Sequence, residues 1–127
     1  MKPYFTAGYN MDLACLKEYR NCGIDEIFAG VNFPTNFGSG RMIHLYELTS
    51  YDKLGEHLRQ AQQWGMKTTF LFNPACTGGK EWKAEGVHEI INLARFLKQF
   101  EVDYLVVGNP FLITVFRRLC PEVKIKM

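Results

Sequence analysis

Leu105-Val106-Val107-Gly108-Asn109-Pro110 is an apolar run that ends at a small residue and an amide side chain. The chain repeats this form at residues 5–10, 27–32 and 70–74. Strands that are buried on both faces of a parallel sheet read as continuous apolar runs rather than alternating ones. Because helical patterns separate the runs, the order predicts parallel βαβ units whose strand ends share one edge. Ligands of α/β folds bind at the carboxyl ends of the strands, so this edge is where function is expected.

Each segment between the runs carries an apolar stripe with the 3.6-residue period of a helix. The four stripes are Leu13, Leu16 and Tyr19; Leu54, Leu58 and Ala61; Val87, Ile90, Ile91, Ala94 and Leu97; and Leu112, Val115, Phe116 and Leu119.

Residues that favour helix ends stand beside these stripes. Thr49 or Ser50 is expected to cap the second helix, which stops at Gly65, and Asn109 followed by Pro110 begins the fourth. Residues 123–127 read as a fifth strand. The expected order is therefore strand and helix four times, followed by one strand.

The composition is that of an ordinary globular domain. The chain has 127 residues, of which 47% are hydrophobic and 22% charged, so residues 1–127 are treated as a single α/β domain. The formal net charge of +2 is too small to indicate a nucleic-acid or anionic-membrane surface. No apolar stretch approaches the ~18 residues of a spanning helix and the start lacks an export signal, so we expect a cytoplasmic protein without membrane contact.

The four cysteines lack metal-binding spacing. Cys15 and Cys22 are about two helical turns apart, too far to share a metal ion. We expect Cys15, Cys22 and Cys120 to be small buried apolar residues. Cys76 differs because it follows a strand end, but its thiolate would need a base or a cation to lower its pKa. We predict no metal site and no cofactor in this chain.

Two architectures have this order of elements. A (β/α)8 barrel typically needs ~250 residues, about twice this length. A flavodoxin-like doubly wound sheet also uses five strands, but a helix normally covers its fifth strand. The first loop has one glycine, Gly8, where a dinucleotide-binding fingerprint needs three. We prefer a parallel (βα)4β unit, the N-terminal half of a TIM-type barrel, and keep the flavodoxin-like sheet as the alternative.

Four motifs follow one another at the expected strand ends and turns. They are Gly38-Ser39-Gly40-Arg41, Asn73-Pro74-Ala75-Cys76-Thr77-Gly78-Gly79, Gly108-Asn109-Pro110-Phe111-Leu112 and Cys120-Pro121-Glu122-Val123. In this order they resemble the N-terminal half of the U-32 family of collagenase-like peptidases. The resemblance extends over essentially the whole chain.

The resemblance implies a TIM-type barrel and the label of a peptidase or hydrolase. Several relatives instead act in tRNA or rRNA hydroxylation or in ubiquinone biosynthesis, and hold an iron–sulfur cluster on cysteines from the later part of their chains. The family signature also belongs to that later part. We therefore expect a cluster only in a full-length relative, catalytic residues outside this chain, and a small-molecule, peptide or RNA substrate of unknown identity.

The candidate substrate-binding residues lie at the expected strand ends. Arg41 suits a bidentate contact to a carboxylate or phosphate, or a salt bridge beside a glycine turn, and we leave both readings open. Gly78 and Gly79 precede a helix and can present amides to an anion. The full set is Gly8, Asn10, Asn32, Gly38, Ser39, Gly40, Arg41, Asn73, Cys76, Gly78, Gly79 and Asn109.

No catalytic group is assigned. His44 falls in a loop and His57 and His88 on helix bodies, facing solvent or neighbouring helices, so spacing gives no triad with Cys76. Asp25 and Asp103 enter strands at the opposite edge and are expected to be turn residues. Tyr9, Phe33 and Phe37 are the aromatic residues expected to line a pocket.

Two functions remain. The first is the N-terminal part of a barrel enzyme that is inactive by itself. The alternative is a noncatalytic interaction module that pairs with another polypeptide through exposed sheet edges. Either a missing C-terminal half or a second copy about a twofold axis would cover the open edges, so self-association is expected.

Overall fold

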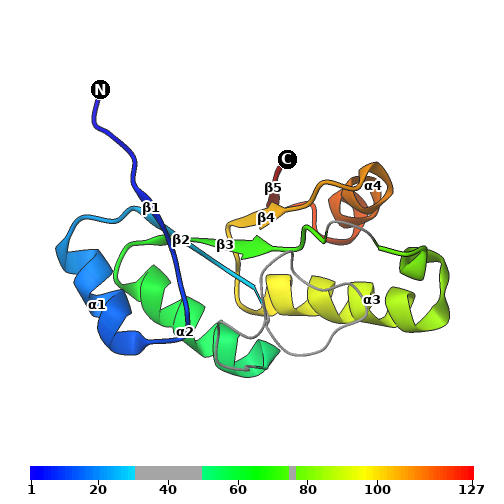
Figure 1. Ribbon diagram of the computed structural model, residues 1–127, viewed down its shortest axis with the longest axis horizontal. Helices are drawn as coiled ribbons and strands as arrows, with labels where there is room; N and C mark the ends of the chain where they lie inside the picture. The colour runs from blue at the N-terminus through cyan, green and yellow to red at the C-terminus, as the bar shows by residue number, and fades with distance from the viewer. Residues whose placement is uncertain (31–49, 75–76) are drawn as a thin grey trace.

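A computed structural model describes residues 1–30, 50–74 and 77–127 of the chain. Over these residues strands and helices alternate in the predicted order (Figure 1). The strands are β1 (Thr6–Gly8), β2 (Glu26–Ala29), β3 (Lys67–Leu71), β4 (Tyr104–Val106) and β5 (Lys124–Lys126). The helices are α1 (Leu13–Asn21), α2 (Tyr51–Gln63), α3 (Ala84–Gln99) and α4 (Pro110–Leu119), with a short 3-10 helix η2 (Lys80–Trp82) before α3.

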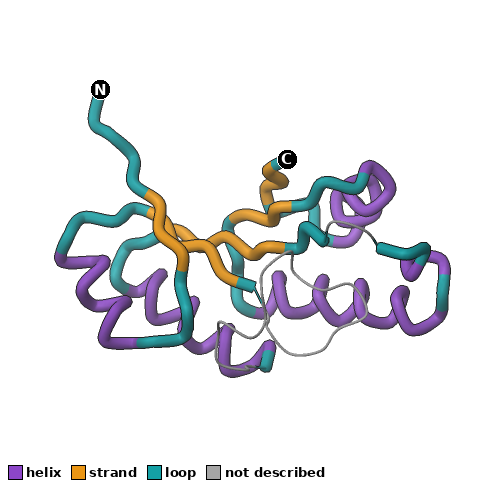
Figure 2. The backbone as a smooth tube through the Cα atoms, viewed as in Figure 1, coloured by secondary structure: helices purple, strands orange, loops and turns teal. Residues whose placement is uncertain are grey.

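The sheet has the strand order β1-β2-β3-β4-β5, and all four neighbouring pairs are parallel. The predicted α/β class and the repeated βα unit are therefore confirmed. Figure 2 shows α1, α2 and α3 along one side of the strands, with α4 beside α3.

The core lies between the sheet and this helix layer. Phe70 of β3 packs edge-on against Phe96 of α3, with ring centroids 5.4 Å apart, and Phe72 packs against Phe116 of α4 at 5.7 Å. All four rings are at most 3% exposed. Burying an aliphatic or aromatic side chain of this size stabilises the fold by roughly 1.5–3 kcal/mol, so this layer is the main source of stability.

The apolar stripes are buried as predicted in α2 and only partly in α3. Leu54, Leu58 and Ala61 are fully buried. In α3, however, Val87 is 44% and Ile91 40% exposed, and in α1 Leu13 is 47% exposed, so the prediction was wrong for these three residues. The predicted stripe was wider than the arc that meets the sheet. Helix α3 turns Leu93 and Phe96 inward instead, beside Ile90, Ala94 and Leu97.

The helix ends are formed by the predicted residues. The Ser50 hydroxyl accepts a hydrogen bond from the backbone N–H of Lys53, and Asn109 caps α4 with Pro110 in its first turn. Gly65 follows α2 with φ of 83°, in the left-handed region that favours glycine. Thr49, the other predicted cap, lies outside the described residues.

The face of the sheet opposite the helices carries a buried carboxylate. Glu26 on β2 is 3% exposed and accepts hydrogen bonds from the hydroxyls of Thr69 and Tyr4, at 2.5 and 2.9 Å. The Lys126 ammonium on β5 donates to the same carboxylate at 2.5 Å. We call these four residues the Glu26 network.

This ion pair requires a curved sheet. Two strands separate β2 from β5, so their backbones would lie roughly 14 Å apart in a flat sheet. On β3, the residue level with Glu26 is Lys67, whereas the residue level with Lys126 is Leu71. The two side chains are therefore also offset by four residues along the strands. A lysine and a glutamate together cannot reach that far. The sheet is therefore concave on the face that holds the Glu26 network.

Candidate ligand-binding cleft

The predicted site residues fall into two groups. Gly8, Asn10, Asn73, Gly78, Gly79 and Asn109 belong to the described chain. The others lie outside it, namely Asn32, Gly38, Ser39, Gly40, Arg41 and Cys76, as do His44, Phe33 and Phe37.

A cleft of about 430 Å³ opens at the carboxyl ends of β3 and β4. This volume is within the range of small-molecule sites. Asn73 and Asn109, both predicted site residues, are brought together there, and we call the site the β3/β4 cleft. The described residues of its lining are Phe72, Asn73, Pro74, Thr77, Gly108, Asn109, Pro110 and Leu112.

Asn109 holds one wall of this cleft. Its side-chain oxygen accepts from the backbone N–H groups of Phe111 and Leu112, at 2.9 and 3.3 Å. Its amide nitrogen donates to the Glu81 carboxylate at 3.5 Å. Both ends of the amide are used, so the orientation of Asn109 is fixed by α4 on one side and by η2 on the other.

Glu81 lies behind the wall. It is 8% exposed, and one of its oxygens, Oε2, has no hydrogen-bond partner among the described residues. A hydrogen bond from the Thr77 side chain is the largest of the effects that lower the pKa of Glu81, and Asn109 adds to it against the opposing effect of burial. The carboxylate is therefore ionised at neutral pH. Glu81 is absent from the predicted site residues because nothing local in the sequence indicates its contact with Asn109.

Gly78 and Gly79 lie next to the cleft, between Thr77 and η2. Both have positive φ, 61° and 74°, which explains glycine at these positions. They are not among the residues that line the cleft. The 3-10 helix that follows has only three residues, so it is too short for the strong N-terminal dipole expected of a longer helix.

The carboxyl end of β1 forms a separate cluster. The Gly8 carbonyl accepts a hydrogen bond from Tyr19, and neither Gly8 nor Asn10 lines the β3/β4 cleft. Tyr9 is 2% exposed, and its hydroxyl lies 2.5 Å from Nδ1 of His57 on α2. Burial raises the pKa of Tyr9, so this hydroxyl keeps its proton. The contact of His57 with Tyr9 was missed because the two residues are 48 positions apart.

A larger hollow of about 490 Å³ lies at the opposite end of the sheet, beside the start of β4. Its carboxylate Asp103 already accepts from the backbone N–H and the hydroxyl of Thr68 and from the Lys67 ammonium. Asp25, at the same edge, accepts from the backbone N–H of Phe5. Both aspartates therefore join strand starts, as predicted, and this hollow is the weaker candidate for a ligand site.

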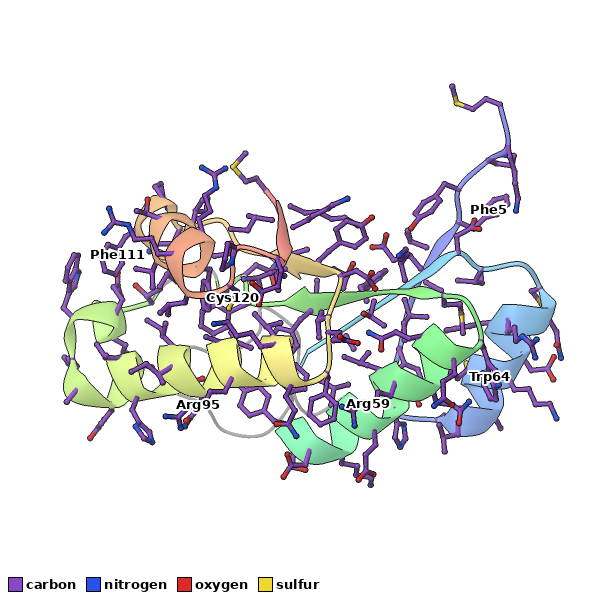
Figure 3. All side chains as sticks on the ribbon, turned by 180° about the vertical axis from the view of Figure 1, so that it is seen from behind. Phe5, Arg59, Trp64, Arg95, Phe111 and Cys120 are labelled. Atoms are coloured by element: carbon purple, nitrogen blue, oxygen red, sulfur yellow. The ribbon has the colours of Figure 1, made fainter. Side chains whose placement is uncertain are left out.

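The cysteines lie in different environments. Cys120 is 1% exposed between α4 and α3 (Figure 3), where burial raises the pKa of its thiol. Cys15 is half-buried, whereas Cys22 is exposed, so the prediction that it is buried was wrong. Cys22 directly follows the last residue of α1, where the chain turns toward β2. Within the described residues no three His, Cys, Asp or Glu side chains gather as a metal site would require.

The described helices include none with the length and apolar character needed to cross a membrane. Searches of protein-family models, curated proteins and solved structures found no match to this chain.

Proposed function

We propose that this chain is the N-terminal half of a TIM-type barrel enzyme similar to the U-32 family, and that the β3/β4 cleft forms part of its substrate site. The observation that carries the proposal is a cleft lined by two asparagines, Asn73 and Asn109, at the carboxyl ends of adjacent parallel strands. Enzymes with the (β/α)8 fold bind their substrates at that end of the strands.

The strand order supports a barrel over a doubly wound sheet. A flavodoxin-like sheet has the order 2-1-3-4-5 and carries helices on both faces. Here neighbours in the sheet are neighbours in the chain, and Phe70 and Phe72 meet α3 and α4 on one face. This is the arrangement in which a sheet can close on itself.

The stagger of the Glu26 network supports the same reading. In an eight-stranded barrel with a shear of eight, residues at one height shift by about one position per strand. Glu26 and Lys126 are three strands apart and four positions out of register. Their contact is therefore close to what side chains of adjacent layers inside a barrel would make, since each layer comes from alternate strands.

The part assigned to this chain is binding rather than catalysis. The described lining of the β3/β4 cleft offers amide and hydroxyl groups but no nucleophile paired with a base. The substrate is a small molecule, a peptide or an RNA, and the reaction of a peptidase or of a hydroxylating relative would use residues outside this chain.

Fragment binding followed by nuclear magnetic resonance tests the proposal. We expect dipeptides, nucleosides or small carboxamides to shift the amide signals of Asn73, Gly108 and Asn109. Asn73→Ala should weaken this binding, whereas Asn21→Ala, at the end of α1, should leave it unchanged. Binding confined to the hollow at the start of β4, or equal affinity for Asn73→Ala, would argue against the proposed site.

The second candidate, an interaction module, is favoured by the open edges of the sheet. Among the described residues β1 pairs only with β2, and β5 only with β4. Unpaired strand edges readily add another strand. Light scattering at micromolar concentration tests this: a second copy that covers the edges would give a dimer, and a proline at Ile125 should dissociate it.

A further inference from the structure

The N-terminus of α4 borders the β3/β4 cleft but has no free amide for an anion. Pro110, in the first turn, has no N–H group. The amides of Phe111 and Leu112 bind the Asn109 side-chain oxygen, and that of Ile113 binds the Asn109 carbonyl. The donors that usually hold phosphate or carboxylate at a helix start are therefore already used.

The charge beside the cleft is negative. Among the described residues that line the cleft, none is cationic. The Glu81 carboxylate lies directly behind the wall, joined to the lining residue Asn109, and its Oε2 has no hydrogen-bond partner among the described residues. A buried charge whose hydrogen bonds are incomplete acts strongly on its surroundings, because little water screens it.

Beside this charge, the lining of the cleft offers acceptor oxygens and apolar surface. The exposed Asn73 side chain offers a carbonyl oxygen, and Thr77 keeps lone pairs available after it donates to Glu81. Pro74 and Pro110 are accessible apolar residues of the same lining. We propose that the β3/β4 cleft binds an alkylammonium group, with the ammonium at the Asn73 and Thr77 oxygens and the alkyl chain on Pro74 and Pro110, and that it rejects anions.

This inference rests on the proposed function only for the position of the site. It is tested with three ligands of similar shape, butylammonium, butyramide and butyrate, each titrated at neutral pH up to tens of millimolar. The amide signals of Asn73, Thr77, Gly108 and Asn109 report binding. We expect butylammonium to bind at least tenfold more tightly than butyrate, with butyramide between them.

Two variants separate the charge of Glu81 from its shape. Glu81→Gln keeps the size of the side chain and should reduce the preference for butylammonium over butyrate roughly tenfold, since a nearby charge is removed. Glu122→Gln removes a carboxylate at the opposite hollow and should leave the preference unchanged.

The wild-type comparison decides the inference even if Glu81→Gln fails to fold. Equal or tighter binding of butyrate overturns it, as does the absence of any shift at the cleft with butylammonium. Binding of neutral fragments at the cleft without preference for the cation overturns the inference and leaves the proposed function standing. Binding confined to the opposite hollow contradicts both.

Discussion

The Glu26 network makes a quantitative prediction about the sheet. Lys126→Met leaves a buried carboxylate without its cation, a change that costs about 3–5 kcal/mol where both partners are fully buried. Lys126 is 39% exposed, and the hydroxyls of Thr69 and Tyr4 still bind Glu26. We therefore expect Lys126→Met to lower the free energy of unfolding by about 2–3 kcal/mol. This is a large share of the roughly 5–15 kcal/mol that stabilises a typical domain.

A double-mutant cycle isolates the ion pair. Urea unfolding of Glu26→Gln, Lys126→Met and the combined variant should give a coupling free energy of about 1–2 kcal/mol, between the values for surface and buried pairs. Lys124→Met is the matched control. Lys124 is on the same strand, and it has no ion pair among the described residues.

The cycle also predicts a dependence on pH. Burial raises the pKa of Glu26, but the hydrogen bonds from Lys126, Thr69 and Tyr4 outweigh it and hold the pKa below its ordinary value of 4.5. The network therefore contributes its full stability above pH 4.5 and loses it as the pH falls through the lowered pKa. The difference between wild type and Glu26→Gln should shrink over that acidic range.

Two results would refute this reasoning. A coupling free energy below about 0.3 kcal/mol would show that Glu26 and Lys126 act independently, as distant sites do. If Lys124→Met lowered the free energy of unfolding as much as Lys126→Met, any lysine on β5 would have the same effect. Either result would remove the support that the ion pair gives to a curved sheet.

Three further predictions concern packing, backbone and thiols. Gly55→Ala would place a Cβ against the buried ring of Phe100 and should lower the free energy of unfolding by about 1–3 kcal/mol in thermal or urea unfolding, while Gly108→Ala, which meets open space, should lower it by less than about 1 kcal/mol. Glu101 has φ of 49°, so Glu101→Gly should raise the free energy of unfolding by roughly 0.5–1 kcal/mol, and no gain would show that the left-handed turn is unstrained. A thiol reagent should label exposed Cys22 quickly and buried Cys120 only after unfolding, as mass spectrometry would show; rapid labelling of Cys120 in the folded protein would contradict its burial.

The order of elements could be predicted because its signals are local. Asn109 accepts hydrogen bonds from amides two and three positions later, and Pro110 follows it in the first turn of α4. Gly65 has the positive φ that ends α2. Asn73 was placed at the cleft for the same reason, since a residue that follows a buried strand must emerge at the end of that strand.

The contacts that were missed join residues far apart in the chain. Glu26 and Lys126 are 100 positions apart, and only the accumulated curvature of three strand pairs brings them together. Glu81 meets Asn109 across 28 positions, so its role in the wall of the cleft has no sequence pattern. The exposed Val87 shows a further reason: periodicity gives the existence of an apolar stripe but not the exact rotation of the helix against the sheet.

The polar residues at the two ends of the strands have different roles in the structure. At the amino ends, Asp25 and Asp103 bind the backbone of neighbouring strands, so their loss would open the sheet. At the carboxyl ends, Asn73 is exposed and has no side-chain hydrogen bond or ion pair to the core among the described residues. Surface substitutions of this kind usually change stability by less than about 0.5 kcal/mol. Ligand preference at the β3/β4 cleft can therefore be altered through Asn73 without unfolding the domain, whereas Asn109 cannot be exchanged so freely because the same side chain begins α4.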